Sequence, residues 1–105
     1  MTGNAATHTG HVHVVLSLKA KPDQLGALKK LLASLVAPTQ AEPGCISYDL
    51  FVNSTDPTNL VYIEEWASRA ALDVHRQTAH VTAALAALGP LIAEAPDDRF
   101  FYKCR

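Results

Sequence analysis

Apolar and polar residues alternate along several stretches of the chain, and each stretch predicts a β-strand. The first is HVHVVLSLKA at 11–20, where valines and leucines recur at every second position. A period of two sends alternate side chains to opposite faces of a strand. CISYDLFVN at 45–53 and NLVYIEEW at 59–66 are the second and third predicted strands, and RFFYKC at 99–104 predicts a final strand because it is dense in aromatic residues. In the second stretch the period of two places four residues on one face: Ile46, Tyr48, Leu50 and Val52.

A helical period separates the first two predicted strands. Lys21-Pro22-Asp23 is typical of a helix start, with proline near the first helical position and aspartate in the first turn. The helix is expected to end near Ala37, because a residue that precedes proline is disfavoured in the helical conformation. Its apolar stripe consists of Leu25, Leu28, Leu32, Leu35 and Val36.

A second helical region follows the third predicted strand. Ser68 is a candidate N-cap for a helix through His75, and Thr78 is a candidate cap for a further helical piece. Gly89-Pro90 is expected to end or bend this piece.

The predicted order is strand, helix, strand, strand, helix, strand. This order is typical of an α+β, ferredoxin-like split β-α-β fold, in which an antiparallel sheet carries both helices on one face. Residues 11–105 are expected to form this single domain, after a flexible tail at 1–10. The other sheet face would carry Val, Phe and Leu among its polar residues, so we expect a homodimer to form through the sheet faces.

The balance of charged residues argues against two classes of partner. Nine basic and ten acidic residues nearly cancel and form no run, which argues against nucleic acid or an anionic membrane. No apolar stretch reaches the length of a membrane span, and the N-terminus does not resemble a secretory signal. We therefore expect a cytoplasmic protein whose Cys45 and Cys104 are free.

Five histidines raise the question of a metal site. His11 and His13 lie two apart on a strand face, and His75 and His80 lie five apart, on different sides of a continuous helix. Neither spacing matches the i, i+4 histidine pair of helical zinc sites, so no metal is expected. The sequence also contains no glycine-rich phosphate loop or dinucleotide fingerprint, so no nucleotide cofactor is expected.

Three segments resemble a known family in order and spacing: EPGCISYDLF, DPTNLVYIEEW and ALDVHRQTAH. They are similar to the antibiotic biosynthesis monooxygenase domain, and specifically to its small quinol monooxygenase-like members. The resemblance spans nearly the whole chain from about His11 to Tyr102. It implies a dimeric α+β barrel with a pocket between sheet and helices in each subunit. It also implies oxidation of quinol or phenolic substrates by molecular oxygen with no cofactor. The positions that match the family's recurring pocket residues are Tyr48, Glu64, Trp66, His75 and His80.

The chemistry of such an oxidation requires a base. A phenolate or quinol anion can pass an electron to oxygen, and histidine, with an ordinary pKa of about 6.5, is suited to form that anion. His75 is the first candidate, because it lies one turn from Leu72 on the helix side that must face the sheet. His80 is the second. Each histidine also has a plainer structural interpretation.

The third strand supplies further candidates. Tyr62, Glu64 and Trp66 share one strand face by parity, whereas Glu65 points the other way. Trp66 is expected to form an apolar wall for an aromatic ring, and Glu64 to orient an imidazole or accept a substrate hydroxyl. Tyr48 and Tyr62 are further candidates for substrate contact, although aromatic residues at such positions commonly pack in a core. By helical phase, Arg76 is expected to face away from this set.

Two other functions are consistent with the same residues. One is an isomerase of a small, phosphorylated or sugar-derived signal, as in related small proteins. The other is a non-enzymatic dimer that binds aromatic ligands. The sequence does not choose among the three, because all require the same aromatic, histidine-bearing cavity.

Overall fold

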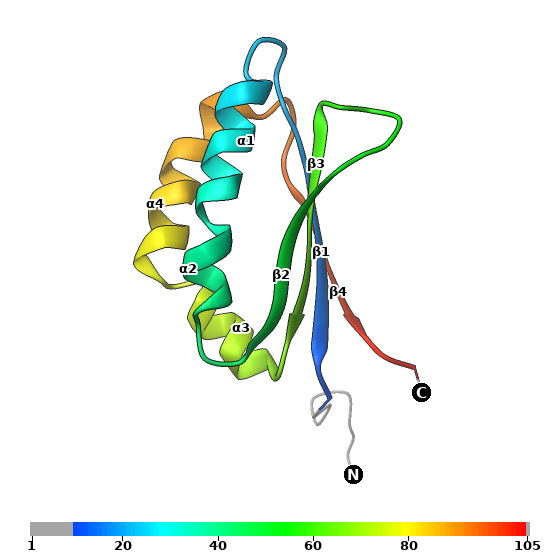
Figure 1. Ribbon diagram of the computed structural model, residues 1–105, viewed down its shortest axis with the longest axis vertical. Helices are drawn as coiled ribbons and strands as arrows, with labels where there is room; N and C mark the ends of the chain where they lie inside the picture. The colour runs from blue at the N-terminus through cyan, green and yellow to red at the C-terminus, as the bar shows by residue number, and fades with distance from the viewer. Residues whose placement is uncertain (1–9, 105) are drawn as a thin grey trace.

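The computed structural model describes residues 10–104, so the predicted tail at 1–10 lies, apart from Gly10, outside the described residues. Its elements follow the predicted order (Figure 1). They are β1 (Val12–Lys19), α1 (Leu25–Ser34), α2 (Val36–Gln40), β2 (Cys45–Val52), β3 (Asn59–Trp66), α3 (Arg69–His75), α4 (Ala79–Leu88), the 3-10 helix η2 (Gly89–Leu91) and β4 (Asp97–Tyr102).

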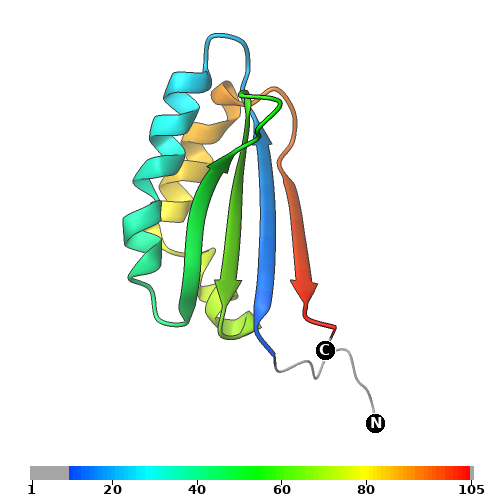
Figure 2. The same cartoon turned by 45° about the vertical axis from the view of Figure 1, so that its right-hand side comes forward.

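The four strands form one antiparallel sheet in the order β2-β3-β1-β4 (Figure 2). The register places Val14 of β1 beside Glu64 of β3 and Leu16 beside Tyr62. Strands β1 and β3 are central, whereas β2 and β4 form the edges. The sheet order confirms the predicted α+β, ferredoxin-like fold.

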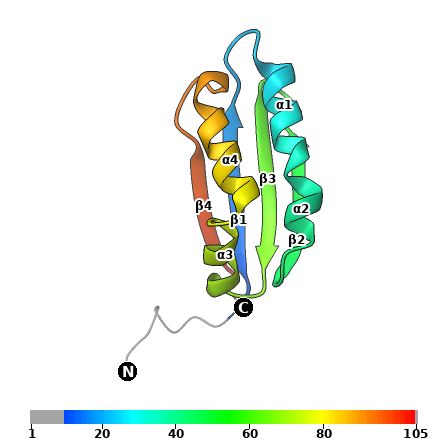
Figure 3. The ribbon, with the colours of Figure 1, turned by 90° about the vertical axis from the view of Figure 1, so that its left-hand side faces the viewer.

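All helices lie on one face of the sheet, in a second layer (Figures 1 and 3). The core between the layers contains Val12, Val14 and Leu18 of β1, which are almost fully buried as the period of two predicts. Leu28 and Leu32 of α1 are equally buried. Within residues 10–104, no helix has both the length and the apolar content needed to cross a membrane.

The start and end of the first predicted helix are both wrong. Lys21–Gln24 forms a turn, in which Asp23 adopts a left-handed φ of 72°, and α1 begins only at Leu25. Aspartate adopts this conformation more readily than most residues. α1 ends at Ser34, three residues before the predicted end at Ala37, and a second helix, α2, then begins at Val36 and contains Pro38. Proline is the third residue of α2, where a missing N–H removes no intrahelical bond.

The predicted face of the second strand is also partly wrong. The pairing of β2 with β3 shifts register between Cys45 and Ser47, as in a β-bulge. A single extra residue reverses the facing of side chains on its far side. Ile46 is therefore 52% exposed, whereas Cys45 packs against the core. Of the predicted face only Tyr48 and Leu50 pack, because Val52 is exposed as well.

Gly44 fixes the start of β2 against α3. Its φ is +83°, and a Cβ atom built on it would lie 2.5 Å from the Cβ of Ala71 in α3. Its carbonyl accepts the backbone N–H of Ala67 at 2.8 Å. This position therefore requires glycine for both conformation and space.

We expect Gly44→Ala to lower the free energy of unfolding by about 2 to 4 kcal/mol, through left-handed strain and the clash with α3. Urea unfolding measures the change. Gly26→Ala is the matched control, because Gly26 lies exposed in α1 and an added Cβ would meet no atom within 4 Å. It should raise stability by about 0.5 to 1 kcal/mol. Equal effects at the two glycines would contradict the proposed close approach.

Candidate active site

A break between α3 and α4 shapes the site. Ser68 caps α3 by accepting the N–H of Ala71, and Thr78 caps α4 by accepting that of Val81, which confirms both predicted caps. The Thr78 hydroxyl also donates to the carbonyl of His75 at 2.8 Å. The two helices are therefore separate pieces that are held together at the turn between them.

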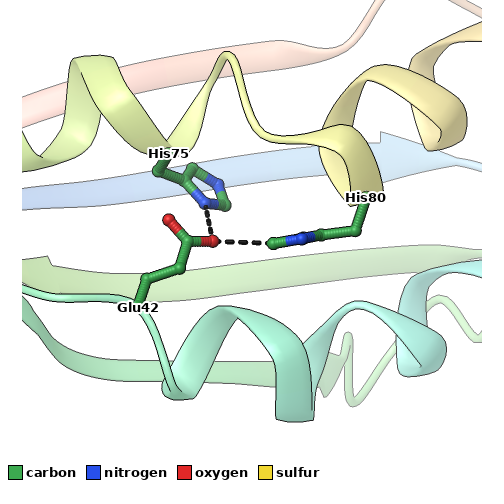
Figure 4. A group of neighbouring side chains, drawn as sticks. All are labelled: Glu42, His75 and His80. Carbon is green, nitrogen blue, oxygen red and sulfur yellow. Dashed lines mark hydrogen bonds and ion pairs between the residues drawn. The ribbon is translucent and has the colours of Figure 1, made fainter.

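Because of this break, the rings of His75 and His80 both contact the carboxylate of Glu42 (Figure 4). His75 Nδ1 lies 2.9 Å from Oε2 of Glu42, and His80 Nε2 lies 2.7 Å from the same oxygen. An ionised carboxylate only accepts hydrogen bonds, so both ring nitrogens act as donors to it. The side chains of His75 and Glu42 are only 7% and 10% exposed, and that of His80 is 26% exposed.

Sequence reasoning missed Glu42, which occurs in a turn and shows no periodic pattern. The prediction that His75 and His80 lie on different sides of a continuous helix is wrong, because the helix is interrupted at Thr78. The candidate N-cap at Thr78 was the signal that could have found this convergence.

Aromatic rings surround His75. The Trp66 ring lies 4.7 Å from the His75 ring, and Tyr48 packs edge-on at 5.5 Å between centroids. Tyr62 lies 4.6 Å from Tyr48, and its hydroxyl donates to the carbonyl of Leu32. These contacts restrict the imidazole to one orientation.

A cavity of about 240 Å³ lies between the sheet and the helices. Four of the six predicted site residues line it: Tyr48, Tyr62, Glu64 and His75. Trp66 is fully buried and packs on His75, and neither it nor His80 is among the lining residues. The remaining wall is mainly apolar: Val14, Leu16, Leu18, Leu32, Leu35, Leu72, Val81, Ala84, Leu85, Leu88 and Pro96, with Arg76 and Asp98.

Glu64 is a buried carboxyl group in this cavity. It is 3% exposed and accepts a hydrogen bond from Nε1 of Trp66 at 2.8 Å. Burial raises the pKa of Glu64 to about 7, against the opposing effect of the Trp66 hydrogen bond. Near neutrality Glu64 can therefore either donate or accept a proton.

The two tyrosines contribute neutral surface. Burial raises the pKa of Tyr48 and that of Tyr62 well above the ordinary value of 10. Both rings therefore stay protonated, and they offer the cavity aromatic faces rather than negative charge.

Arg76 corrects a further expectation, because it lines the cavity instead of facing away. It forms an ion pair with Asp98 of β4, and its guanidinium lies 4.8 Å from the centre of the Phe100 ring. Arg76 still has helical backbone angles and donates its N–H to the carbonyl of Leu72, so it lies one turn after Leu72 on the helix face that meets the cavity. Glu65 points to the opposite sheet face as predicted, where it contacts His11 at 2.6 Å.

The comparisons with known proteins agree with this architecture. Residues 11–87 match the family model described as antibiotic biosynthesis monooxygenase. The chain belongs to this family. The match covers both central strands and the segment from Glu42 to His80, so every residue of the Glu42, His75 and His80 cluster lies within it.

Two curated relatives support a monooxygenase-type function for the family. "Putative monooxygenase Rv0793" of Mycobacterium tuberculosis is 42% identical over 84 residues, which cover 80% of this chain and 82% of the relative. "Putative monooxygenase YcnE" of Bacillus subtilis is 33% identical over 81 residues, which cover 77% of this chain and 84% of the relative.

The fold also matches a solved structure. The structure of Rv0793 superposes with a TM-score of 0.87 at 33% identity, and the match covers 91% of this chain and 97% of that one. The shared architecture thus extends over nearly all of the described chain.

The raised pKa of Glu64 predicts how the free energy of unfolding depends on pH. Because the folded-state pKa is raised from 4.5 to about 7, the protonated group favours folding below pH 4.5. This contribution to the free energy of unfolding falls as the pH rises above 4.5, and it is lost once the pH exceeds the folded-state pKa of about 7. Glu64→Gln cannot ionise, and its amide oxygen still accepts the Trp66 N–H. We expect it to match wild type at pH 4 and to exceed it at pH 8 by on the order of 2 kcal/mol.

Urea unfolding at both pH values provides the measurement. The matched control is Glu65→Gln on the exposed face, where the pKa of the carboxyl is lowered, chiefly by its hydrogen bond with His11. This control should show no gain at high pH. Parallel pH curves for wild type and Glu64→Gln would contradict the burial of an ionisable group.

Proposed function

We propose that this protein is a cofactor-independent monooxygenase that oxidises a small quinol or polyphenol with molecular oxygen. One observation carries the proposal. His75 lines a mainly apolar cavity while its Nδ1 is hydrogen-bonded to the partly buried carboxylate of Glu42. A positioned base in a cavity that accepts an aromatic ring is what the formation of a quinol anion requires.

Glu42 determines which nitrogen of His75 acts as the base. A carboxylate that accepts the Nδ1 proton leaves Nε2 of the neutral ring as the acceptor. The carboxylate also stabilises the imidazolium that forms when Nε2 takes a substrate proton, as in other carboxylate–histidine pairs. Glu42 is thus a positioning residue, and His75 is the catalytic base.

The oxidation then balances without an added reductant. Nε2 of His75 takes the proton of one hydroxyl, and the resulting anion transfers one electron to oxygen, which forms a semiquinone and superoxide. The two radicals combine into a carbon–oxygen bond, and the peroxide loses water. A dihydroxyarene and O₂ thereby give a hydroxyquinone and one water. The substrate supplies all four electrons.

The other predicted site residues contact the substrate in this proposal or support the residues that do. Glu64 in the cavity wall, whose pKa burial raises to about 7, is suited to hydrogen-bond a second substrate hydroxyl as donor or acceptor. Tyr48 and Tyr62 provide ring faces against the substrate. Trp66 supports His75 and Glu64 from behind and does not form the wall itself. His80 acts through Glu42.

The lining favours an aromatic substrate over a phosphorylated one. Among the described residues that line the cavity, Arg76 is the only arginine or lysine, and Asp98 already pairs with it. Recognition of a phosphate usually needs several such donors. This argues for the oxidation over the isomerase alternative.

We also propose that two copies form a homodimer through their bare sheet faces. The face opposite the helices exposes Phe51, Ile63 and Phe101, each close to half exposed. Ile63 pairs laterally with Val15 of β1, and Phe51 of β2 pairs with Val61 of β3, so apolar side chains adjoin across strands at two levels of this face. Such a patch on a small domain is typical of an interface.

We expect His75→Ala to lower oxygen uptake with a dihydroxyarene by about 100-fold or more, because the base is lost. Glu42→Gln should also lower the rate, since an amide does not stabilise the imidazolium. An oxygen electrode measures both, and circular dichroism checks folding. Val74→Ala is the control, because Val74 is exposed on α3 and is neither in the cavity wall nor on the bare sheet face. Unchanged turnover in His75→Ala would refute the role of this base.

Two outcomes would favour the alternative functions. Full conversion of a substrate under anaerobic conditions would identify an isomerase. Tight binding of a quinone or polyphenol with no turnover over hours would identify a non-enzymatic binder.

The dimer has its own test. We expect Ile63→Lys to shift the mass in light scattering from two chains to one, because a desolvated lysine would oppose the apolar patch. Val74→Lys is the matched control, since Val74 is an exposed valine on α3 of the helical layer. A wild-type protein of one-chain mass would contradict the dimer.

A further inference from the structure

The Glu42, His75 and His80 cluster has a second chemical capacity, which the oxidation does not use. We propose that these three side chains form a binding site for a divalent transition metal ion of the Zn²⁺ type. The site joins donor atoms from three parts of the chain: the turn before β2, the end of α3 and the first turn of α4 (Figure 4).

The donor geometry fits a metal. Oε2 of Glu42, Nδ1 of His75 and Nε2 of His80 all lie within 4.8 Å of one another. Zinc binds histidine nitrogen and carboxylate oxygen at about 2.0 to 2.2 Å, so small side-chain rotations bring all three atoms to bonding distance. Two histidines and one glutamate, with water in a fourth position, are an established zinc ligand set.

The charge of the cluster also favours a cation. Within residues 10–104, the ion-pair partners of Glu42 are His75 and His80, and no lysine or arginine lies within pairing distance. A carboxylate whose side chain is only 10% exposed is stabilised by positive charge nearby. A divalent ion bound between the three donor atoms would supply that charge.

The surroundings hold the ligands in place and leave a route for entry. His75 is fixed by Trp66 on its ring and by Thr78 on its carbonyl. His80 is 26% exposed, so an ion and its water can reach the cluster from the solvent side. Contacts of the kind that hold His75 orient a metal ligand and thereby strengthen a metal site.

Metal binding would inhibit the oxidation proposed above. Only this inhibition rests on the proposed function, whereas the metal site itself does not. Coordination through Nδ1 holds the proton of neutral His75 on Nε2, which then donates and no longer accepts. Zinc should therefore inhibit oxygen uptake in proportion to the occupancy of the site.

The test titrates metal-free protein with Co²⁺, followed by visible absorption, and with Zn²⁺, followed by calorimetry. We expect one ion per chain. His80→Ala and Glu42→Gln should each weaken binding at least tenfold, because each removes one of three ligands. His13→Ala is the matched control, since His13 lies on β1 outside the cluster and should leave the affinity unchanged.

Absence of binding at micromolar metal, or equal affinity in His80→Ala and wild type, would overturn the site. If Glu42→Gln does not fold, nitrogen NMR of the wild-type histidine rings decides, because zinc must shift His75 and His80 and leave His13 in place. Binding is measured without substrate. A protein that binds zinc but consumes no oxygen would refute the oxidation alone, and one that oxidises quinol but binds no zinc would refute the metal site alone.

Discussion

The contact of one partly buried carboxylate with two imidazoles is the interaction on which the site depends. Glu42 is separated from His75 by 33 residues and from His80 by 38, yet both rings contact the same oxygen. A carboxylate that is largely removed from water is stabilised by hydrogen-bond donors. These donors come from the end of α3 and from the start of α4, so both elements must meet the turn before β2. Gly44 permits that meeting, because its missing side chain allows α3 to approach.

The sheet forms the cavity wall opposite the helices, because alternate side chains of each strand point to the same face. Every second residue of β3 faces the helices, which places Tyr62, Glu64 and Trp66 in one row. The row combines an aromatic face, an ionisable group and a ring that supports His75. Most of the remaining lining is aliphatic, so the few polar groups act in a medium that strengthens their electrostatic effects.

Much of this arrangement could be predicted from the sequence, because it depends on local patterns. The strands, the faces of β1 and β3 and the caps at Ser68 and Thr78 follow from periodicity and side-chain chemistry. Glu42 could not be found in this way, since its role comes from a contact across the fold. The bulge that exposes Ile46 is likewise decided by strand pairing, which a local pattern does not record. The position of Arg76, by contrast, follows from helical phase, because it lies four residues after Leu72.

The edge position of β4 has a consequence for how this strand is held in place. This strand is hydrogen-bonded to β1 along one side only, over six residues. It nevertheless carries Asp98 in the cavity wall, and Phe100, which lies under the guanidinium groups of Arg69 and Arg76. Side-chain contacts from α3 and from the residue after it hold this strand from the helical layer, since Arg76 pairs with Asp98 and both guanidinium groups stack on Phe100. An edge strand with one backbone partner is thus tied to the sheet by hydrogen bonds and to the helices by cation–π contacts.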